Sequence, residues 1–167
     1  MRIIAGTHRG KKLLEYYSST TRPTTDRVKE NVFNLLTNYI DFNGLRVLDL
    51  FAGTGAYGIE CLSRGASFVH FNDCDGKAVA IIKKNVGQTW HNWSVSQKDY
   101  LSAIKGEYDL IFLDPPYESN FGEIAIDAIQ SGLIVFETDR DFEHPQIVTK
   151  RRYGRAWIYL IQKQKTN

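Results

Sequence analysis

Residues 47–58 read Val-Leu-Asp-Leu-Phe-Ala-Gly-Thr-Gly-Ala-Tyr-Gly, an apolar run that passes into a glycine-rich turn. The apolar run predicts a buried strand, and the residues after the turn predict a helix. Because glycine has no Cβ atom, such a turn lets the backbone come close to a ligand. In a doubly wound sheet the turn lies at the carboxyl end of the first strand, where ligands bind. We therefore expect Gly53 and Gly55 to border a binding site.

Two acidic residues downstream favour a site for an adenosine-containing cofactor. Asp73 follows the next predicted strand, 20 residues beyond Gly53, where a carboxylate can accept hydrogen bonds from ribose hydroxyls. Asp99 follows the third predicted strand, where it could meet an adenine amino group or cap a surface helix. The spacing Gly53-x-Gly55-x-x-Gly58 also satisfies the dinucleotide fingerprint, so a nicotinamide-dependent oxidoreductase stays open at this point.

Strand and helix signals alternate from residue 46 onward. The predicted strands are 46–51, 67–73, 94–97, 108–114, 133–137, 146–150 and 156–162, and the predicted helices are 56–63, 75–86 and 121–130. A small β-hairpin (2–5 with 11–14) and a helix over about 26–39, capped by Thr25 or Asp26, precede them. The alternation predicts an α/β protein with a doubly wound, seven-stranded Rossmann-like sheet and an antiparallel C-terminal edge. With 167 residues, we expect one domain, in which 1–24 form an N-terminal arm and 25–167 the core.

Residues 109–117, Asp-Leu-Ile-Phe-Leu-Asp-Pro-Pro-Tyr, indicate the class of reaction. The apolar part predicts a central strand of a parallel sheet. Two prolines end the strand and stiffen the chain, so the Asp114 carboxylate and the Pro115 carbonyl are expected to point toward one place. Two acceptors suit the two N–H bonds of an exocyclic amine, and Tyr117 can stack on a planar base. The catalytic residues predicted here are therefore Asp114, Pro115 and Tyr117.

Charge is unevenly distributed around a net value of +2. Residues 1–30 carry seven Lys/Arg and three Asp/Glu, residues 144–167 carry six Lys/Arg and no acid, and the middle of the chain is acidic. Basic ends favour contact with a polyanion, although solubilising surface charge would give the same composition. No apolar run approaches the roughly 20 residues of a membrane helix, and the two cysteines form no metal or disulfide pattern. These features predict a cytoplasmic protein that binds neither membrane nor metal, with a monomer as the default expectation.

Taken together, Asp49-Leu-Phe-Ala-Gly-Thr-Gly55, the acid at 73 and Asp-Pro-Pro-Tyr at 114–117 resemble an S-adenosylmethionine-dependent N-methyltransferase. Four more stretches narrow the resemblance to the bacterial 16S ribosomal RNA guanine-N2 methyltransferase family. They are Arg2-Ile-Ile-Ala-Gly6, Arg9-Gly-Lys-Lys-Leu13, Arg22-Pro-Thr-Thr-Asp-Arg-Val-Lys-Glu30 and Leu62-Ser-Arg-Gly-Ala66. The resemblance covers nearly the whole chain. It departs at Asn72-Asp73-Cys74-Asp75, where Val-Glu/Asp-x-Asp is more usual, and in a short stretch after Tyr117.

The resemblance implies transfer of a methyl group from S-adenosylmethionine to the exocyclic N2 of a guanine in small-subunit ribosomal RNA. The implied cofactor-binding residues are Asp49, Phe51, Gly53, Gly55, Asp73 and Asp99, with Arg22 and Thr24 toward the methionine end. The implied RNA contacts are Arg9, Lys11, Lys12 and Arg27, which would hold phosphates and give position without sequence. The expected partner is ribosomal RNA, free or in the small ribosomal subunit.

Three other functions compete with this one. A DNA adenine-N6 or cytosine-N4 methyltransferase would use the same Asp-Pro-Pro-Tyr site, but such enzymes usually carry a recognition domain for which 167 residues leave no room. A nicotinamide-dependent oxidoreductase would leave Asp-Pro-Pro-Tyr unexplained. A non-catalytic RNA-binding ribosome-assembly factor would keep the fold without turnover, and a methyl-transfer assay separates it from an enzyme.

Overall fold

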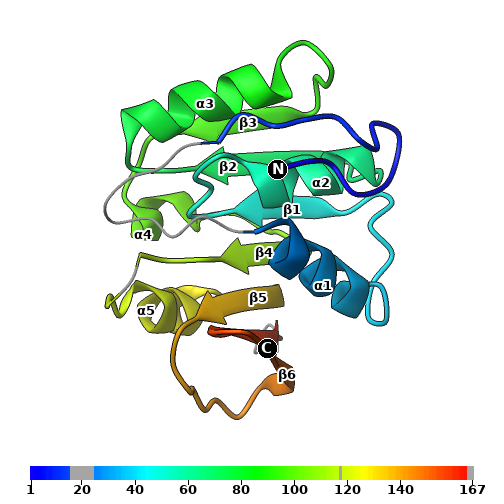
Figure 1. Cartoon of the computed structure of the whole chain (residues 1–167). Coiled ribbons are helices and arrows are strands. Elements are labelled where there is room, and N and C mark those ends of the chain that lie inside the picture. Colours follow the sequence, from blue (N-terminus) through cyan, green and yellow to red (C-terminus); the bar gives the residue numbers. More distant parts are fainter. Residues whose placement is uncertain (16–24, 117, 165–167) are drawn as a thin grey trace.

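The computed structural model of the chain describes residues 1–15, 25–116 and 118–164. Their strands form one sheet in the order β3-β2-β1-β4-β5-β7-β6 (Figure 1). The elements are α1 (Asp26–Leu36), β1 (Arg46–Asp49), α2 (Ala56–Ser63), β2 (Phe68–Asn72), α3 (Gly76–Val86), β3 (Trp93–Ser96), α4 (Tyr100–Ala103), β4 (Leu110–Leu113), α5 (Phe121–Ala128), β5 (Gly132–Thr138), β6 (Ile147–Tyr153) and β7 (Ala156–Lys163). The predicted seven-stranded α/β sheet is confirmed.

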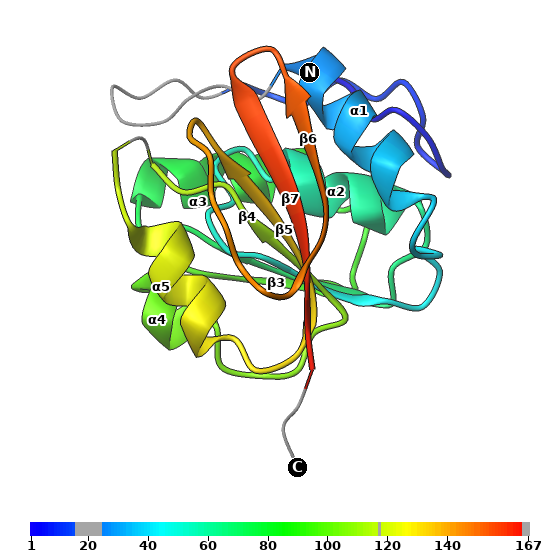
Figure 2. The same cartoon turned by 90° about the horizontal axis from the view of Figure 1, so that it is seen from below.

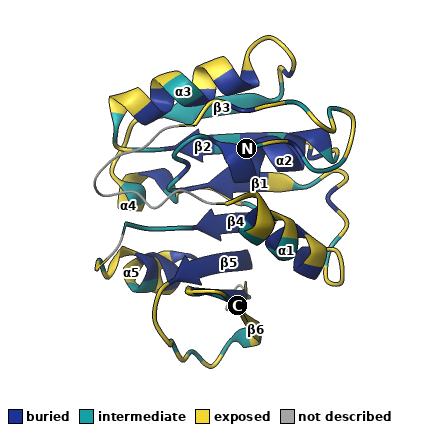
Figure 3. Cartoon of the chain, in the orientation of Figure 1, coloured by how far each residue is buried: buried dark blue, intermediate teal, exposed yellow. Residues whose placement is uncertain are grey.

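Helices cover both faces of the sheet, as Figures 1 and 2 show, with α1, α2 and α3 on one face and α4 and α5 on the other. Each face has its own apolar core. The first includes Phe33, Ile59 and Ile82, and the second includes Ala103 and Ile126. β4 is buried at every position, as expected for a strand covered on both sides, and Figure 3 shows the central strands dark.

Strand direction decides where the functional residues gather. The pairs β1·β2, β1·β4, β2·β3 and β4·β5 are all parallel, so β1 to β5 end at one edge of the sheet, which we call the carboxyl edge. β7 runs antiparallel to both β5 and β6, which confirms the predicted antiparallel C-terminal edge. Loops that follow parallel strands at such an edge form the usual ligand site of α/β sheets.

The first residues of the chain fold back on themselves. The Ile3 N–H donates to the Lys11 carbonyl (2.9 Å), and the Leu13 N–H donates to the Met1 carbonyl (2.8 Å). The predicted hairpin is therefore present, but its regular pairing is limited to an isolated bridge between Arg2 and Lys12. The Gly10 N–H also donates to the Ile3 carbonyl (2.8 Å), whereas the Ile4 and Ala5 N–H groups donate to the Glu60 side chain on α2, so the pairing does not extend further.

A buried ion pair fastens this N-terminal arm to the core. The Lys29 ammonium on α1 lies 3.0 Å from the Glu60 carboxylate on α2, and both side chains are fully buried. Glu60 also accepts hydrogen bonds from the Ile4 and Ala5 N–H groups, at 2.8 and 3.1 Å. Burial opposes the charge of Glu60, but Lys29 and the Ile4 hydrogen bond outweigh it and hold the pKa of Glu60 below its usual value. Burial lowers the pKa of Lys29.

Most element boundaries differ from the predicted ones by one to three residues, and one short helix was not predicted. α1 ends at Leu36, earlier than the predicted residue 39, because the chain turns after Thr37. β1 ends at Asp49, since Leu50 and Phe51 already belong to the turn. The four-residue α4 was not predicted, because so short a helix has no periodicity to detect.

None of the helices in the described part of the chain combines the length and the apolar character that a membrane span requires.

Candidate active site

A cavity of about 520 Å³ opens at the carboxyl edge, between the ends of β1, β2, β3 and β4. Five residues that the sequence predicted for the site line it: Phe51, Asp73, Asp99, Asp114 and Pro115. Its other lining residues are Leu50, Asn72, Cys74, Asp75, Lys98, Tyr100, Leu101, Pro116 and Phe121. Residues predicted separately to bind cofactor and amine therefore share one cavity.

Asp73 holds the glycine turn in place. One carboxylate oxygen accepts from the Gly53 N–H at 2.9 Å, and the other accepts from the Asp75 N–H at 2.9 Å. Burial is the main cause that raises the pKa of Asp73. Gly53 has φ +57°, and a Cβ added to it would meet nothing within 4 Å, so this backbone faces open space. Each Asp73 oxygen keeps a lone pair for a ligand.

Asp49 supports the same turn from inside the protein. It is buried, does not line the cavity, and accepts a hydrogen bond from the Gly58 N–H at 3.0 Å. Burial raises the pKa of Asp49 to about 7. Gly55, with φ +82°, directly precedes α2 as its N-cap residue and is buried. Both residues shape the turn, and any effect they have on a ligand acts through the backbone of residues 50–55.

Asn72 is a site residue that sequence reasoning missed as a functional position. Its buried amide nitrogen donates to the carbonyls of Lys98 (3.0 Å) and Leu50 (3.4 Å). Its amide oxygen accepts from the Lys98 N–H at 3.0 Å and from the Ser96 hydroxyl at 2.7 Å. Asn72 thus joins the ends of three strands, β1, β2 and β3. One signal for this position was present in the sequence: Asn72 stands where the family pattern usually has valine.

Asp99 caps a helix, which is one of the two roles that the sequence left open, and it also lies on the cavity wall. Its carboxylate caps α4 by accepting from the Leu101 N–H at 3.1 Å, and the residue also lines the cavity. Three rings continue the wall beside it: Tyr100 lies 5.5 Å from Phe51 and 4.9 Å from Phe121, between ring centroids. Of these rings, sequence reasoning had predicted only Phe51 for the site.

Asp114 and Pro115 follow β4 directly and lie beside a buried tyrosine–glutamate pair. The Tyr57 hydroxyl donates to the Glu137 carboxylate at 2.8 Å, and the Tyr57 ring stacks on Phe112 at 4.9 Å with an interplanar angle of 2°. Burial, followed by the charges of Glu137 and Asp114, raises the pKa of Tyr57 well above its usual value. Tyr57 therefore stays neutral and remains a donor.

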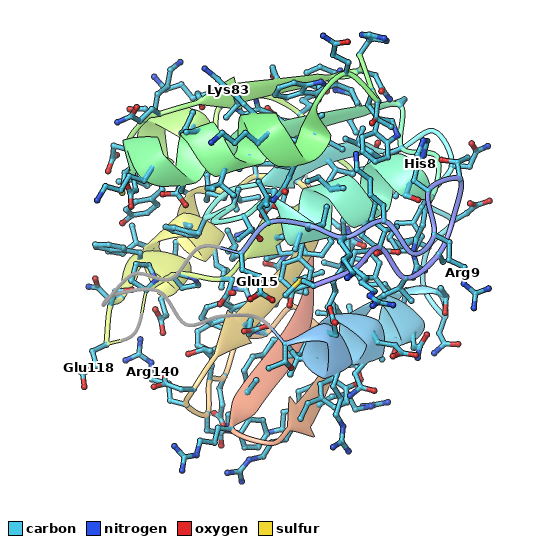
Figure 4. The ribbon with its side chains drawn as sticks, turned by 45° about the horizontal axis from the view of Figure 1, so that its top comes forward. His8, Arg9, Glu15, Lys83, Glu118 and Arg140 are labelled. Atoms are coloured by element: carbon cyan, nitrogen blue, oxygen red, sulfur yellow. The ribbon has the colours of Figure 1, made fainter. Side chains whose placement is uncertain are left out.

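The segment after the Asp-Pro-Pro turn is tied to the end of β5. Arg140 donates to the Ser119 carbonyl and lies 3.3 Å from the Glu123 carboxylate. Glu118 has φ 58°, a left-handed conformation that is uncommon for residues other than glycine. Figure 4 shows Glu118 and Arg140 close together on one side of the molecule.

The other predicted site residues either do not line the cavity or fall outside the described residues. Tyr117, Arg22 and Thr24 fall outside them. Arg9 and Lys12 are exposed, and Figure 4 shows Arg9 on the side of the molecule opposite Glu118.

Lys11 and Arg27 complete the predicted RNA contacts. The Lys11 ammonium donates to the Thr89 hydroxyl at 3.1 Å and lies 5.1 Å from the centre of the Trp90 ring. Arg27 is exposed in the first turn of α1. The arm near Lys11 contacts Thr89 and Trp90, which do not line the cavity, and Arg27 is the second residue of α1.

The fold and site together define the class: this is a methyltransferase-type Rossmann-like protein. A glycine turn follows β1, an acid follows β2, and Asp-Pro-Pro follows β4. A solved structure of the Escherichia coli protein yhhF, named provisionally as a methyltransferase, superposes with a TM-score of 0.85 at 28% identity and 99% coverage of both chains. Residues 1–162 match the family described as "Conserved hypothetical protein 95", and the chain belongs to that family.

Curated relatives extend the likeness over most of the sequence. YlbH of Bacillus subtilis, named provisionally as an rRNA methyltransferase, is 36% identical over 187 aligned positions that include 98% of this chain and 100% of the relative. Ribosomal RNA small subunit methyltransferase D of Haemophilus influenzae is 38% identical over 156 positions, covering 84% of this chain and 80% of that protein.

Proposed function

We propose that the chain transfers a methyl group from S-adenosylmethionine to the exocyclic N2 of a guanine in small-subunit ribosomal RNA. The observation that carries the proposal is the shared cavity. Asp114 and Pro115, suited to an exocyclic amine, line the same space as Asp73 and Asp99, suited to an adenosine. The names of the relatives support methylation of ribosomal RNA, and the N-terminal motifs support guanine N2 within that class.

The residues present fit S-adenosylmethionine. Asp73 would hold the ribose hydroxyls with the lone pairs left after its two backbone bonds, and Asp99 would accept from the adenine amine. The open backbone at Gly53 leaves room for a ligand to approach. Bound there, S-adenosylmethionine supplies a methyl group on positively charged sulfur.

Asp114 and Pro115 prepare the amine. The N2 of guanine is a poor nucleophile, because its lone pair is delocalised into the ring. Hydrogen bonds from its two N–H groups to the Asp114 carboxylate and the Pro115 carbonyl would localise that lone pair. As the new N–C bond forms, the bond between the methyl carbon and sulfur breaks and the sulfur becomes neutral. One N–H bond of the amine must also break, and its proton would pass to the Asp114 carboxylate or to water. Positioning and electrostatics supply the rate, without a covalent intermediate.

The target base must leave its stack before it can enter the cavity. Loop nucleotides of RNA are the least costly to unstack. The rings of Phe51, Tyr100 and Phe121 give the cavity an apolar wall suited to planar groups. Such a protein would act where ribosomes are assembled, in the cytoplasm.

The test compares two variants with tritiated S-adenosylmethionine. Asp114→Asn keeps the shape but weakens one acceptor, and Asp127→Asn makes the same change at an exposed position on α5. We expect Asp127→Asn to label small subunits that lack native guanine-N2 methylation, and Asp114→Asn to lose at least ~100-fold in rate while still binding the cofactor.

Digestion of the labelled RNA decides the target. N2-methylguanosine supports the proposal, whereas label in duplex DNA would move the function to a DNA methyltransferase. Cofactor binding without transfer to any of these substrates would favour the non-catalytic assembly factor.

A further inference from the structure

The last two strands carry a group of cations that the proposed site does not use. Lys150, Arg151 and Arg152 on β6 and Arg155 in the β6–β7 turn are all exposed. Across the described residues, no carboxylate lies within ion-pair distance of the three arginines. Lys150 alone has an acidic partner, the exposed Asp141 at 3.4 Å. We call residues 150–157 the basic hairpin.

Strand register places the basic hairpin at the carboxyl edge. Thr138 at the end of β5 pairs with Trp157, and Trp157 pairs with Arg152. Because Leu113 pairs with Phe136, Asp114 follows β4 almost level with these residues. Neighbouring strands are about 4.8 Å apart, and β5 and β7 lie between β4 and β6. The backbone of Arg152 is therefore about 14 Å from that of Asp114, measured across the sheet. Figure 2 shows β6 and β7 side by side with their turn at the top of the view.

An aromatic ring orders two of the cations. The Lys150 ammonium and the Arg152 guanidinium carbon each lie 5.3 Å from the centre of the Trp157 ring. Arg152 also donates to the Gly154 carbonyl at 3.1 Å. Cation–π contacts of this kind hold long side chains in place, and the guanidinium keeps further N–H donors for phosphate oxygens. These contacts therefore fix the Lys150 and Arg152 side chains in positions from which they can bind a polyanion.

We propose that the basic hairpin binds the phosphate backbone of the RNA beside the target nucleotide. The inference rests on the proposed function, since it takes Asp114 to mark the target base. Asp73 and Asp99 would hold the cofactor at the ends of β2 and β3. The RNA that carries the target base would therefore lie over the ends of β4, β5, β7 and β6. Arg9, at the tip of the N-terminal arm, lies on the side of the molecule opposite Glu118, which follows the Asp-Pro-Pro turn (Figure 4). Phosphate contacts of this kind position a substrate without reading its sequence.

The test removes three charges from the basic hairpin in the full-length protein. Arg151→Gln, Arg152→Gln and Arg155→Gln are combined, and the matched control combines Lys77→Gln, Lys83→Gln and Lys84→Gln on α3, at the opposite end of the sheet (Figures 1 and 4). The dissociation constant for unmethylated naked 16S ribosomal RNA is measured against salt concentration. Each lost phosphate contact reduces the salt slope by about 0.7–0.9, so we expect a reduction of about 2 and at least ~10-fold weaker binding at low salt.

The expected pattern is weaker RNA binding for the hairpin variant, with cofactor affinity and thermal midpoint unchanged, and wild-type RNA binding for the control. An unchanged slope, or an equal loss in the control, would overturn the proposal. So would normal binding to naked RNA combined with weaker binding to assembled subunits, which would assign the hairpin to an acidic protein. If the unaltered protein methylates no RNA, the proposed function fails. The salt dependences of RNA binding by the hairpin variant and by the control still show whether the basic hairpin binds RNA.

Discussion

A single buried carboxylate, Asp49, supports the glycine turn through the Gly58 N–H. Its pKa, raised by burial to about 7, means that the folded protein holds a proton that the unfolded chain releases near pH 4. The stability that this proton contributes is complete below pH ~4 and is lost as pH rises through ~7. We expect Asp49→Asn to remove this dependence and to be more stable than the unaltered protein above pH ~7, by at most roughly 4 kcal/mol.

Urea unfolding at several pH values between about 4 and 8 measures the difference. The exposed Asp127→Asn variant should keep the pH dependence of the unaltered protein, since its carboxyl group is not buried. Parallel curves for Asp49→Asn and the unaltered protein would show that Asp49 ionises normally in the fold.

Single residues also mark how far sequence reasoning reaches. Asp73 and Asp114 were predicted because each follows an apolar strand, and strand ends are local features of the sequence. Asn72 and Glu137 act through partners more than 20 residues away. No local pattern encodes such contacts, so only the folded structure brings them to the site.

At the scale of elements, the packing of α2 against β2 depends on one missing side chain. A Cβ at Gly58 would lie 2.3 Å from a ring carbon of Phe71 and 2.9 Å from Val69. We expect Gly58→Ala to lower the free energy of unfolding by about 1–3 kcal/mol through overpacking, and to weaken cofactor binding, because α2 follows the glycine turn.

Gly76→Ala is the matched control at the start of α3. Its Cβ would approach the end of the exposed Gln97 side chain at 3.3 Å, so the change should be neutral or stabilise by about 0.5–1 kcal/mol. Differential scanning calorimetry compares the two variants. Equal midpoints would mean that the α2–β2 contact tolerates a methyl group.

Elements were predicted well where their periodicity is long and poorly where it is short. The apolar runs of β1, β4 and β5 and the spacing in α1 and α3 identified those elements directly. The four-residue α4 was missed, and the predicted N-terminal hairpin is present but short, because Ile4 and Ala5 donate to Glu60 on α2. In both cases tertiary contacts decide the local structure, and propensity alone does not reveal them.

Across the whole molecule, the Lys29–Glu60 pair joins α1, α2 and the N-terminal arm. Removing one partner of a buried pair leaves the other charge uncompensated. We expect Glu60→Gln to lower the free energy of unfolding by about 3–5 kcal/mol and to speed hydrogen exchange at the Ile4 and Ala5 amides. Glu30→Gln, an exposed change on α1, serves as the control. Unaltered exchange at Ile4 in Glu60→Gln would mean that the arm is held by other contacts.

The position of β6 at the end of the sheet has a consequence for the behaviour of the protein in a crowded solution. One side of β6 has no strand partner among the described residues, and an open strand edge can pair with the edge of another molecule. Lysines and arginines on such an edge repel a second copy and discourage aggregation. Lys150, Arg151 and Arg152 would therefore keep the protein dispersed during synthesis and folding, before any nucleic acid is met.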